Sequence, residues 1–382
     1  MSKINVRSFS NENEDGAPDL VGITTFSATS YFVPTRGTTA QRPSDHVEVG
    51  SLRYNTDTKT LEFYRGHTIG WASFELIDPD LGGGTGSNTG LGTRGVFGPG
   101  EAPHGDTIDF LTISTFGDST DFGNLTQDRR SGGAMGSSET RGLFAGGQHP
   151  SPFTFFNTID FVTIASAGID ASDFGDLNDK AYNVSGMSTK TRGLAACGQK
   201  GPSFSAVNTI EYVTIAQTGK AVDFGDLSTV RVLVAGAASS TRGLFAGGHD
   251  TTNVIDYITI SSLGNAQDFG DLQSGAARKG MLSCSNSTRA LFAGGETPSN
   301  SNIIDFVTIA TLGNGQNFGD LTFVTNTSSG TSSPTRGIFA GGSADTIDKV
   351  EILTTGDAVD FGNLGRGSSR CYGAFSNGHG GL

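Results

Sequence analysis

The sequence predicts an all-β fold, and three observations lead to that prediction. The composition is rich in Gly and Phe, short segments alternate apolar with polar residues, and one pattern of about 48 residues recurs along the chain. The 382 residues include 57 Gly and 26 Phe, and only 16% are charged, against about 25% in an ordinary soluble domain. No segment of the repeat carries the 3.6-residue spacing of an amphipathic helix.

The repeat has four parts in a constant order. It begins with Thr-Arg-Gly/Ala and an apolar run that usually ends in Gly-Gly, where Gly permits the positive φ of a turn. Ile-Asp/Glu-Phe/Tyr, then Asp/Asn-Phe-Gly-Asp/Asn-Leu, and finally a run of small residues follow. Each part is expected to form one short strand. The six copies begin at Arg94, Arg141, Arg192, Arg242, Arg289 and Arg336.

Four strands in about 48 residues are typical of one blade of a β-propeller. The small-residue strand suits the crowded centre of the ring, and the aromatic positions represented by Phe144, Phe161 and Phe174 are expected to pack between blades. The first copy lacks a small-residue strand, whereas the C-terminus carries an extra one near residues 372–377. We therefore predict a six-bladed propeller over residues 94–382, closed by the C-terminal strand, because closure removes exposed sheet edges.

The order of the four parts resembles kelch repeats over residues 94–382. The resemblance implies a kelch-like propeller. It departs from the family at the outer strand, where Phe replaces the usual Trp, and this departure speaks against an enzyme-type propeller.

Residues 1–80 lack the repeat and are predicted to be a separate β region, followed by a Gly-rich linker at 81–93. A hairpin and a third strand are expected within residues 50–74. Residues 42–71 closely match the pattern RPxxxxxGxxRYNTxTxxxExYxGxxW, with one additional residue before Gly50 and two before Trp71. This pattern resembles a module of tail-fibre and other virion proteins of tailed bacteriophages. Together with the TRGLFAGG and IDYITIA repeats, it is similar to structural proteins of cyanobacterial phages. The resemblance implies that residues 1–80 anchor the chain to a virion.

Composition and motifs indicate no chemistry. The net charge of −13 argues against a nucleic-acid partner, and no apolar run is long enough for membrane insertion. Residues 1–16 lack the apolar core of a secretory signal. The six His and three Cys are widely spaced, and the turn at residues 117–121 lacks a full calcium-ligand series. We expect no enzyme activity, no cofactor and no metal.

Binding is expected on the connections that follow Gly-Gly, because they vary in length and leave the same side of every repeat. The candidate residues are His149, Phe153, Phe155, Phe156, Phe204 and His249. Their aromatic rings either fold down to cap the blades or form an apolar patch for another subunit or a host-surface ligand. The six repeat arginines could line an anion site, but the matching number of Asp and Glu favours structural ion pairs with the Asp of Asp-Phe-Gly or of Ile-Asp-Phe.

These observations favour a virion structural protein, synthesised in the host cytoplasm, that displays a propeller. Other virion proteins are the expected partners of the N-terminal region, a host glycan or receptor is the expected partner of the loops, and a homo-oligomer is left open. Two alternatives remain: a carbohydrate-active propeller, either lectin or glycan hydrolase, and a cytoplasmic kelch-type interaction scaffold.

Overall fold

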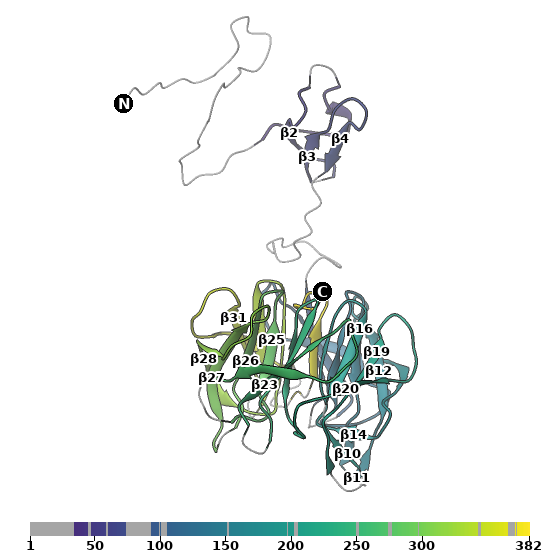
Figure 1. Ribbon diagram of the computed structural model, residues 1–382. Helices are drawn as coiled ribbons and strands as arrows, with labels where there is room; N and C mark the ends of the chain where they lie inside the picture. The colour runs from purple at the N-terminus through teal and green to yellow at the C-terminus, as the bar shows by residue number, and fades with distance from the viewer. Residues whose placement is uncertain are drawn as a thin grey trace, which may run out of the picture. The chain divides into compact units, whose positions relative to one another are not determined.

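The chain divides into two compact units, Met1–Ile77 and Asp78–Leu382. The computed structural model describes residues 34–44, 47–58, 60–73, 93–98, 100, 105–150, 153–196, 198–201, 205–249, 252–273, 277–296, 298–342, 345–365, 371 and 373–382 (Figure 1). Within them the chain is all-β apart from the 3-10 turn Thr39–Gln41. The predicted linker at 81–93 lies outside the described residues except for Thr93.

The first unit contains one four-stranded sheet in the order β1-β2-β3-β4 among its described residues. Its strands are β1 (Arg36–Gly37), β2 (Leu52–Asn55), β3 (Thr60–Tyr64) and β4 (Trp71–Ser73). Strands β2, β3 and β4 are antiparallel, as the hairpin and third strand predicted within residues 50–74 require. The two-residue strand β1 pairs with β2 in parallel.

In its described residues the second unit has six antiparallel four-stranded sheets, here numbered 1 to 6. Sheet 1 is β33 (Gly373–Ser376), β5 (Arg94–Gly98), β6 (Thr107–Thr112) and β7 (Thr120–Asn124). Sheet 2 is β8 (Gly133–Ser137), β9 (Arg141–Ala145), β12 (Thr158–Thr163) and β13 (Ser172–Asp176). Sheet 3 is β15 (Ser185–Ser188), β16 (Arg192–Ala196), β19 (Thr209–Thr214) and β20 (Val222–Asp226).

Sheet 4 is β21 (Ala235–Ala238), β22 (Arg242–Ala246), β23 (Val254–Thr259) and β24 (Gln267–Asp271). Sheet 5 is β25 (Leu282–Ser285), β26 (Arg289–Ala293), β27 (Ser301–Thr308) and β28 (Gln316–Thr325). Sheet 6 is β29 (Ser329–Ser332), β30 (Arg336–Ala340), β31 (Thr346–Glu351) and β32 (Val359–Asn363). Each sheet combines three strands of one copy with the small-residue strand that ends the preceding copy, and in sheet 1 the C-terminal strand β33 takes that place.

Sheet 1 joins the two ends of the second unit. Strand β33 pairs with β5 from Gly373 opposite Gly98 to Ser376 opposite Gly95. The pairing predicted for the C-terminal strand is therefore confirmed, although Tyr372 itself lies outside the described residues. The first and last parts of the unit share one hydrogen-bonded sheet.

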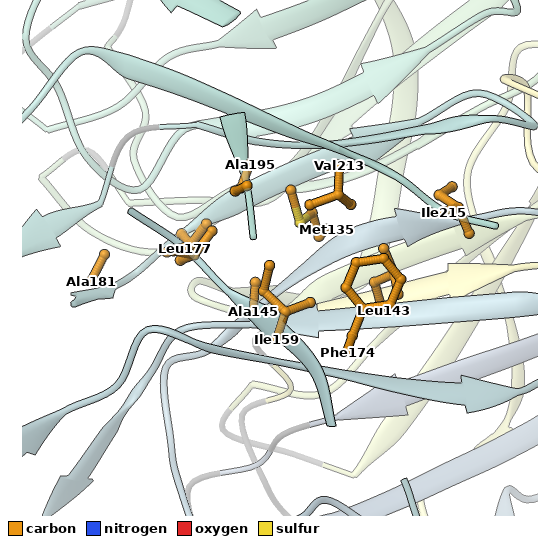
Figure 2. Packing of buried hydrophobic residues seen from close by; sticks show 12 residues of the cluster. Met135, Leu143, Ala145, Ile159, Phe174, Leu177, Ala181, Ala195, Val213 and Ile215 are labelled. Atoms are coloured by element: carbon orange, nitrogen blue, oxygen red, sulfur yellow. The ribbon is translucent and has the colours of Figure 1, made fainter. Parts of the chain in front are cut away.

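Apolar residues pack between successive sheets in six clusters of the described residues. Figure 2 shows the cluster in which Leu143 and Phe174 of sheet 2 meet Val213 of sheet 3. Another cluster joins Phe97 of sheet 1 to Ile338 of sheet 6. The sixth sheet thus packs on the first, as each other sheet packs on its successor.

The aromatic positions of the repeat are buried largely as predicted. Phe144 and Phe174 are 0% and 2% exposed, whereas Phe161 is only partly buried and meets Phe174 edge to face at 6.2 Å between ring centroids. The same edge-to-face pair recurs in sheets 1, 3, 4 and 5. In sheet 6 Lys349 stands at this position, and its Nζ lies 4.7 Å from the ring centroid of Phe116.

The six repeat arginines differ from the prediction of ion pairs with Asp. Each Nη1 donates to the backbone carbonyl of an Ile in the next sheet, for example Arg242 to Ile309 at 2.8 Å, and Arg336 of sheet 6 reaches Ile113 of sheet 1 at 3.2 Å. The other four donate to Ile164, Ile215, Ile260 and Ile352. Among the described residues only Arg336 also meets a carboxylate, that of Glu351. These arginines tie neighbouring sheets together.

An aromatic ring explains this preference. The guanidinium of Arg242 stacks over Tyr257 at 4.6 Å, and those of Arg94, Arg141, Arg192 and Arg289 stack in the same way over Phe110, Phe161, Tyr212 and Phe306. A planar guanidinium stacked on a ring keeps its edge donors free for a carbonyl. In these five sheets the ring thereby directs the arginine towards the neighbouring sheet, whereas Arg336 reaches Ile113 with Lys349 at the aromatic position.

The buried carboxylates pair instead with arginines that the sequence reasoning missed. Arg129, Arg231 and Arg278 are at most 1% exposed and contact Asp160, Asp256 and Asp305 at 3.0, 2.7 and 2.6 Å. They follow the Leu of Asp-Phe-Gly-Asp/Asn-Leu by four or six residues, in three of the six copies. For Asp348 of sheet 6 the equivalent place is taken by Thr325 at the end of β28 in sheet 5, and Asp348 is hydrogen-bonded by Thr322 alone among the described residues. Burial accordingly raises the pKa of Asp348.

Exposed side-chain hydrogen bonds also join the outer strands of neighbouring sheets. In each, an Oδ1 in one turn accepts a backbone N–H from the preceding sheet: Asp170 from Asn124, Asn265 from Asp226, Asn314 from Asp271, Asp357 from Asp320 and Asp118 from Asn363. Four of these pairs combine one Asp with one Asn. Asp320 and Asp357 are both acids, so that junction places two carboxylates side by side.

Candidate binding site

The connections after the second strand of each sheet gather at one end of the second unit, and two of them carry strands of their own. Strands β10 (Gln148–Pro150) and β11 (Phe153–Phe155) form a hairpin. The next connection adds β17 (Gln199–Lys200) and β18 (Ser205–Ala206), which pair with each other, and β17 also pairs with β14 (Ala181–Tyr182) from the segment before sheet 3. Figure 1 shows β10, β11 and β14 projecting together from the sheets, at the end away from the C-terminus. This projection is here called the loop end.

Phe155 does not belong to an exposed patch, which corrects its prediction as a partner contact. The side chain is 8% exposed, and its ring stacks on Tyr182 with 5.1 Å between centroids and 26° between planes. A Cβ at Gly201 would collide with the same ring, so Gly201 closes over it. Phe155 thus packs the β10–β11 hairpin against the neighbouring connection. This agrees with the predicted alternative in which the aromatic rings fold down onto the sheets.

The other predicted residues lie at different depths. Phe156 is half-buried, and its N–H donates to the carbonyl of Gly147. His149 is also half-buried, with Nε2 3.8 Å from a carboxylate oxygen of Asp128. His249 is exposed at its turn. Phe153 lies in β11 opposite Pro150, and Phe204 lies outside the described residues.

A small cavity opens at the same end, between the first strands of the sheets. Its volume is about 90 Å³, and its described lining contains Ser, Gly, Ala and other uncharged residues, with no Asp or Glu. Ligand pockets usually span about 300–1,000 Å³, and one water occupies about 30 Å³ of liquid. The cavity therefore suits a few waters or one small neutral group, and a glycan could meet only its rim.

Residues with a left-handed backbone line this cavity. Non-Gly residues rarely take a positive φ, yet Ser131, Asn183, Leu233 and Thr327 have φ of 55°, 56°, 57° and 54°. Their backbones bond from one sheet to the next: the N–H of Asn183 donates to Ser131 and that of Thr327 to Gly280. The left-handed conformation of each such residue costs about 1–3 kcal/mol of backbone energy. The hydrogen bonds between neighbouring sheets offset this cost and keep the residues in that conformation. No local motif in the sequence marked these positions.

The C-terminal residues line a second, adjoining cavity of about 50 Å³ at the opposite end of the first strands. His379 Nε2 lies 3.0 Å from both the hydroxyl of Ser188 and the carbonyl of Ser137. Burial lowers the pKa of His379 to about 4, so the ring is neutral near pH 7. Sequence reasoning noted this His only as unsuited to metal binding.

Among the described residues there is no cluster of three or more His, Cys, Asp or Glu that could hold a metal ion. Nor does any described helix have the length and apolarity needed to cross a membrane. Cys284 is a buried free thiol whose pKa is raised by burial, and Cys371 is also buried. Cys197 lies outside the described residues.

Fold and site together define an all-β protein of repeated four-stranded sheets whose longest connections gather at one end. No protein-family model matches the chain, and no curated protein matches it by sequence.

Proposed function

We propose that residues 94–382 form a six-bladed, kelch-like β-propeller that serves as a rigid binding scaffold, and that the chain is a structural protein of a tailed-phage virion. The propeller is supported by the six inter-sheet clusters, by the arginine ties that run from sheet 6 back to sheet 1, and by the pairing of β33 with β5. Closure of this kind leaves no inner sheet edge exposed. It also gives the loop end a rigid support.

The observation that carries the virion assignment is the match of residues 42–71 to the phage module. In the structure the residues of that pattern contact one another. Glu62 accepts hydrogen bonds from Arg42 and Asn55, and the Trp71 indole donates to the carbonyl of Pro43 at 2.9 Å. The residues of the pattern thus stabilise the fold of this unit. Their contacts support the proposal that the unit is the same module as in the phage proteins. In this proposal the N-terminal unit attaches the chain to other virion proteins.

The loop end is the proposed contact surface for a second virion protein or for a glycan or receptor of the host surface. Variable connections on a rigid scaffold are where binding usually lies, and left-handed backbone held at Leu233 and Thr327 indicates a precisely shaped end. The cavity of about 90 Å³ favours protein or glycan contact at the rim over a buried substrate. Of the carbohydrate-active alternatives, the cavity therefore argues against a glycan hydrolase but not against a lectin, and we propose no catalysis.

Mass spectrometry of purified phage particles tests this proposal. The chain should be found in intact particles, and a deletion of residues 1–77 should remove it from them while the second unit still melts cooperatively. Substitution of exposed His249 by Asp should reduce adsorption or assembly without altering incorporation through the N-terminal unit. Absence of the chain from particles would refute the virion assignment and leave the cytoplasmic scaffold.

A further inference from the structure

The last residues of the first strands form a series of hydrogen bonds between neighbouring sheets. In each bond a buried serine hydroxyl donates to the backbone carbonyl at the same position of the preceding sheet, and sheet 1 donates to sheet 6. The donors are Ser137, Ser188, Ser285, Ser332 and Ser376, and their acceptors are Ser376, Ser137, Ala238, Ser285 and Ser332 in the same order. These bonds, here called the serine series, cover five of the six junctions between sheets.

The serine series has one break, at the junction of sheets 3 and 4. Strand β21 ends in Ala238, which has no hydroxyl to donate to the carbonyl of buried Ser188 in sheet 3. The Ser188 carbonyl therefore lacks the hydrogen bond that the carbonyls at the other five junctions accept. A buried carbonyl is normally paired, because leaving it without a donor lowers stability. The break is thus a place where another part of the chain can dock.

Residues 378–382 dock at this break. Gly381 is packed so tightly that a Cβ at this position would lie 1.8 Å from the carbonyl oxygen of Ser188. The N–H of the preceding residue, Gly380, donates to the carbonyl of Ser285 in sheet 5 at 2.9 Å. The segment therefore extends from sheet 3 to sheet 5 across the break. Any residue larger than Gly at position 381 would push the segment away from Ser188, because a side chain has no room there.

One side chain anchors this segment. His379 Nδ1 accepts the N–H of Gly381 at 3.1 Å, so the ring proton lies on Nε2. That Nε2 is 3.0 Å from both Ser188 Oγ and the carbonyl oxygen of Ser137, which are themselves hydrogen-bonded in the serine series. The described lining of the second cavity includes His379 and contains no Asp, Glu, Lys or Arg. Hydrogen bonds, and no ion pair with these side chains, therefore hold the ring.

We propose that residues 378–382 are a releasable strap that replaces, at the break, the hydroxyl tie that sheet 4 lacks. Three of the five residues are Gly, so His379 is the main anchor of the strap. The strap can leave without unpairing a strand, because β33 already ends at Ser376. A hydroxyl introduced at residue 238 would compete with the strap for the space beside the Ser188 carbonyl. The inference does not depend on the proposed function.

Hydrogen–deuterium exchange of the purified full-length chain, followed by mass spectrometry, tests the strap. In the wild-type chain the amides of residues 378–382 should exchange more slowly than in an unstructured peptide but about tenfold or more faster than those of β33, because the strap opens locally. Gly381→Ala and Ala238→Ser should each speed exchange in the strap by about tenfold or more. The matched control is Ala374→Ser, which adds a hydroxyl to the first strand of sheet 1 and should leave strap exchange unchanged.

Thermal melting separates competition at the break from simple damage. When Gly381→Ala has released the strap, adding Ala238→Ser should raise the melting temperature by about 2 °C or more, because the new hydroxyl completes the serine series. In the wild-type chain Ala238→Ser should bring no such gain, since the hydroxyl and the strap exclude each other. Equal changes in both backgrounds would overturn the proposal. So would wild-type strap amides that exchange as fast as an unstructured peptide or only as slowly as β33.

Discussion

The two units of this chain bury opposite kinds of side chain. In the second unit Phe, Ile and Leu fill the spaces between sheets, and each sheet face finds an apolar neighbour within the same chain. In the sheet of the first unit the buried side chains are Arg53, Asn55 and Glu62 together with Tyr64, whereas Leu52, Tyr54 and Leu61 are 36–47% exposed. The comparison shows how repetition completes a hydrophobic core within one chain, because each repeat buries the apolar face of the next. A sheet present once must find its cover elsewhere.

The largest expected effect is loss of the apolar contact that joins the ends of the second unit. Phe375 in β33 is 3% exposed and packs against Phe144 with 4.8 Å between ring centroids. Phe375→Ala should lower the free energy of unfolding by about 3–5 kcal/mol, measured by far-UV circular dichroism in urea. Leu263→Ala, at an exposed site, should change it by less than about 0.5 kcal/mol. An equal effect of the two substitutions would contradict the role of β33 in closure.

The ionic groups of the two units should respond unequally. Asp256→Asn leaves Arg231 charged and fully buried, and breaking such a pair costs about 3–5 kcal/mol. Glu62→Gln should cost less, because the 33% exposed side chain of Arg42 can return to water and buried Arg53, 3.6 Å from Glu62, keeps its hydrogen bond to the carbonyl of Thr38. Urea titrations followed by circular dichroism for the second unit and by Trp71 fluorescence for the first separate the two effects. A larger loss of stability for Glu62→Gln than for Asp256→Asn would contradict this difference between the two units.

Acid should weaken the second unit before the first. The pKa of His379 is about 4 in the folded chain, against about 6.5 when unfolded. The contribution of His379 to the free energy of unfolding is therefore complete above pH 6.5. It falls by up to about 3 kcal/mol as the pH drops towards 4, because only the unfolded chain then binds the proton. The lowered pKa of Glu62 removes stability from the first unit only as the pH falls below about 4.5.

The variant His379→Gln isolates this contribution. Its melting temperature should vary less than that of the wild-type chain between pH 7 and pH 4.5, followed by circular dichroism. The difference between the two chains cancels the opposite contributions of Asp305 and Asp348, whose raised pKa values favour the folded state as the pH falls. Parallel pH profiles would show that His379 is not held neutral.

The smallest effect should come from the exposed junction of two acids. Asp320→Asn keeps the backbone N–H that donates to Asp357 and removes the repulsion between the carboxylates. Stability should rise by about 0.5 kcal/mol or less, as for other exposed charge pairs. Asp271→Asn, whose partner is the neutral Asn314, is the control and should bring no gain in differential scanning calorimetry. A loss of stability in Asp320→Asn would contradict this interpretation.

The candidate site shows where sequence reasoning reached its limit. The varying connections after Gly-Gly were visible in the chain, and so was the run of Phe from 153 to 156. The stacking of Phe155 on Tyr182 was not, because these residues belong to different repeats and meet only when two connections lie side by side. The exposure of Leu52, Tyr54 and Leu61 in the first unit could not be predicted either. The alternation of residues along a strand does not indicate which of its two faces the rest of the chain covers.

The sequence by itself determined the strands, their order in each repeat and the pairing of the C-terminal strand with the first repeat, because these follow from two-residue alternation, Gly turns and copy number. Only the tertiary structure decided the partners of the charged groups. Arg242 lies three residues from Phe245 in sequence but reaches Ile309 of the next sheet, while Arg231 takes the buried Asp256. A guanidinium has several donors and many acceptors within reach of a long side chain, so packing between sheets, and not spacing along the chain, selects its partner.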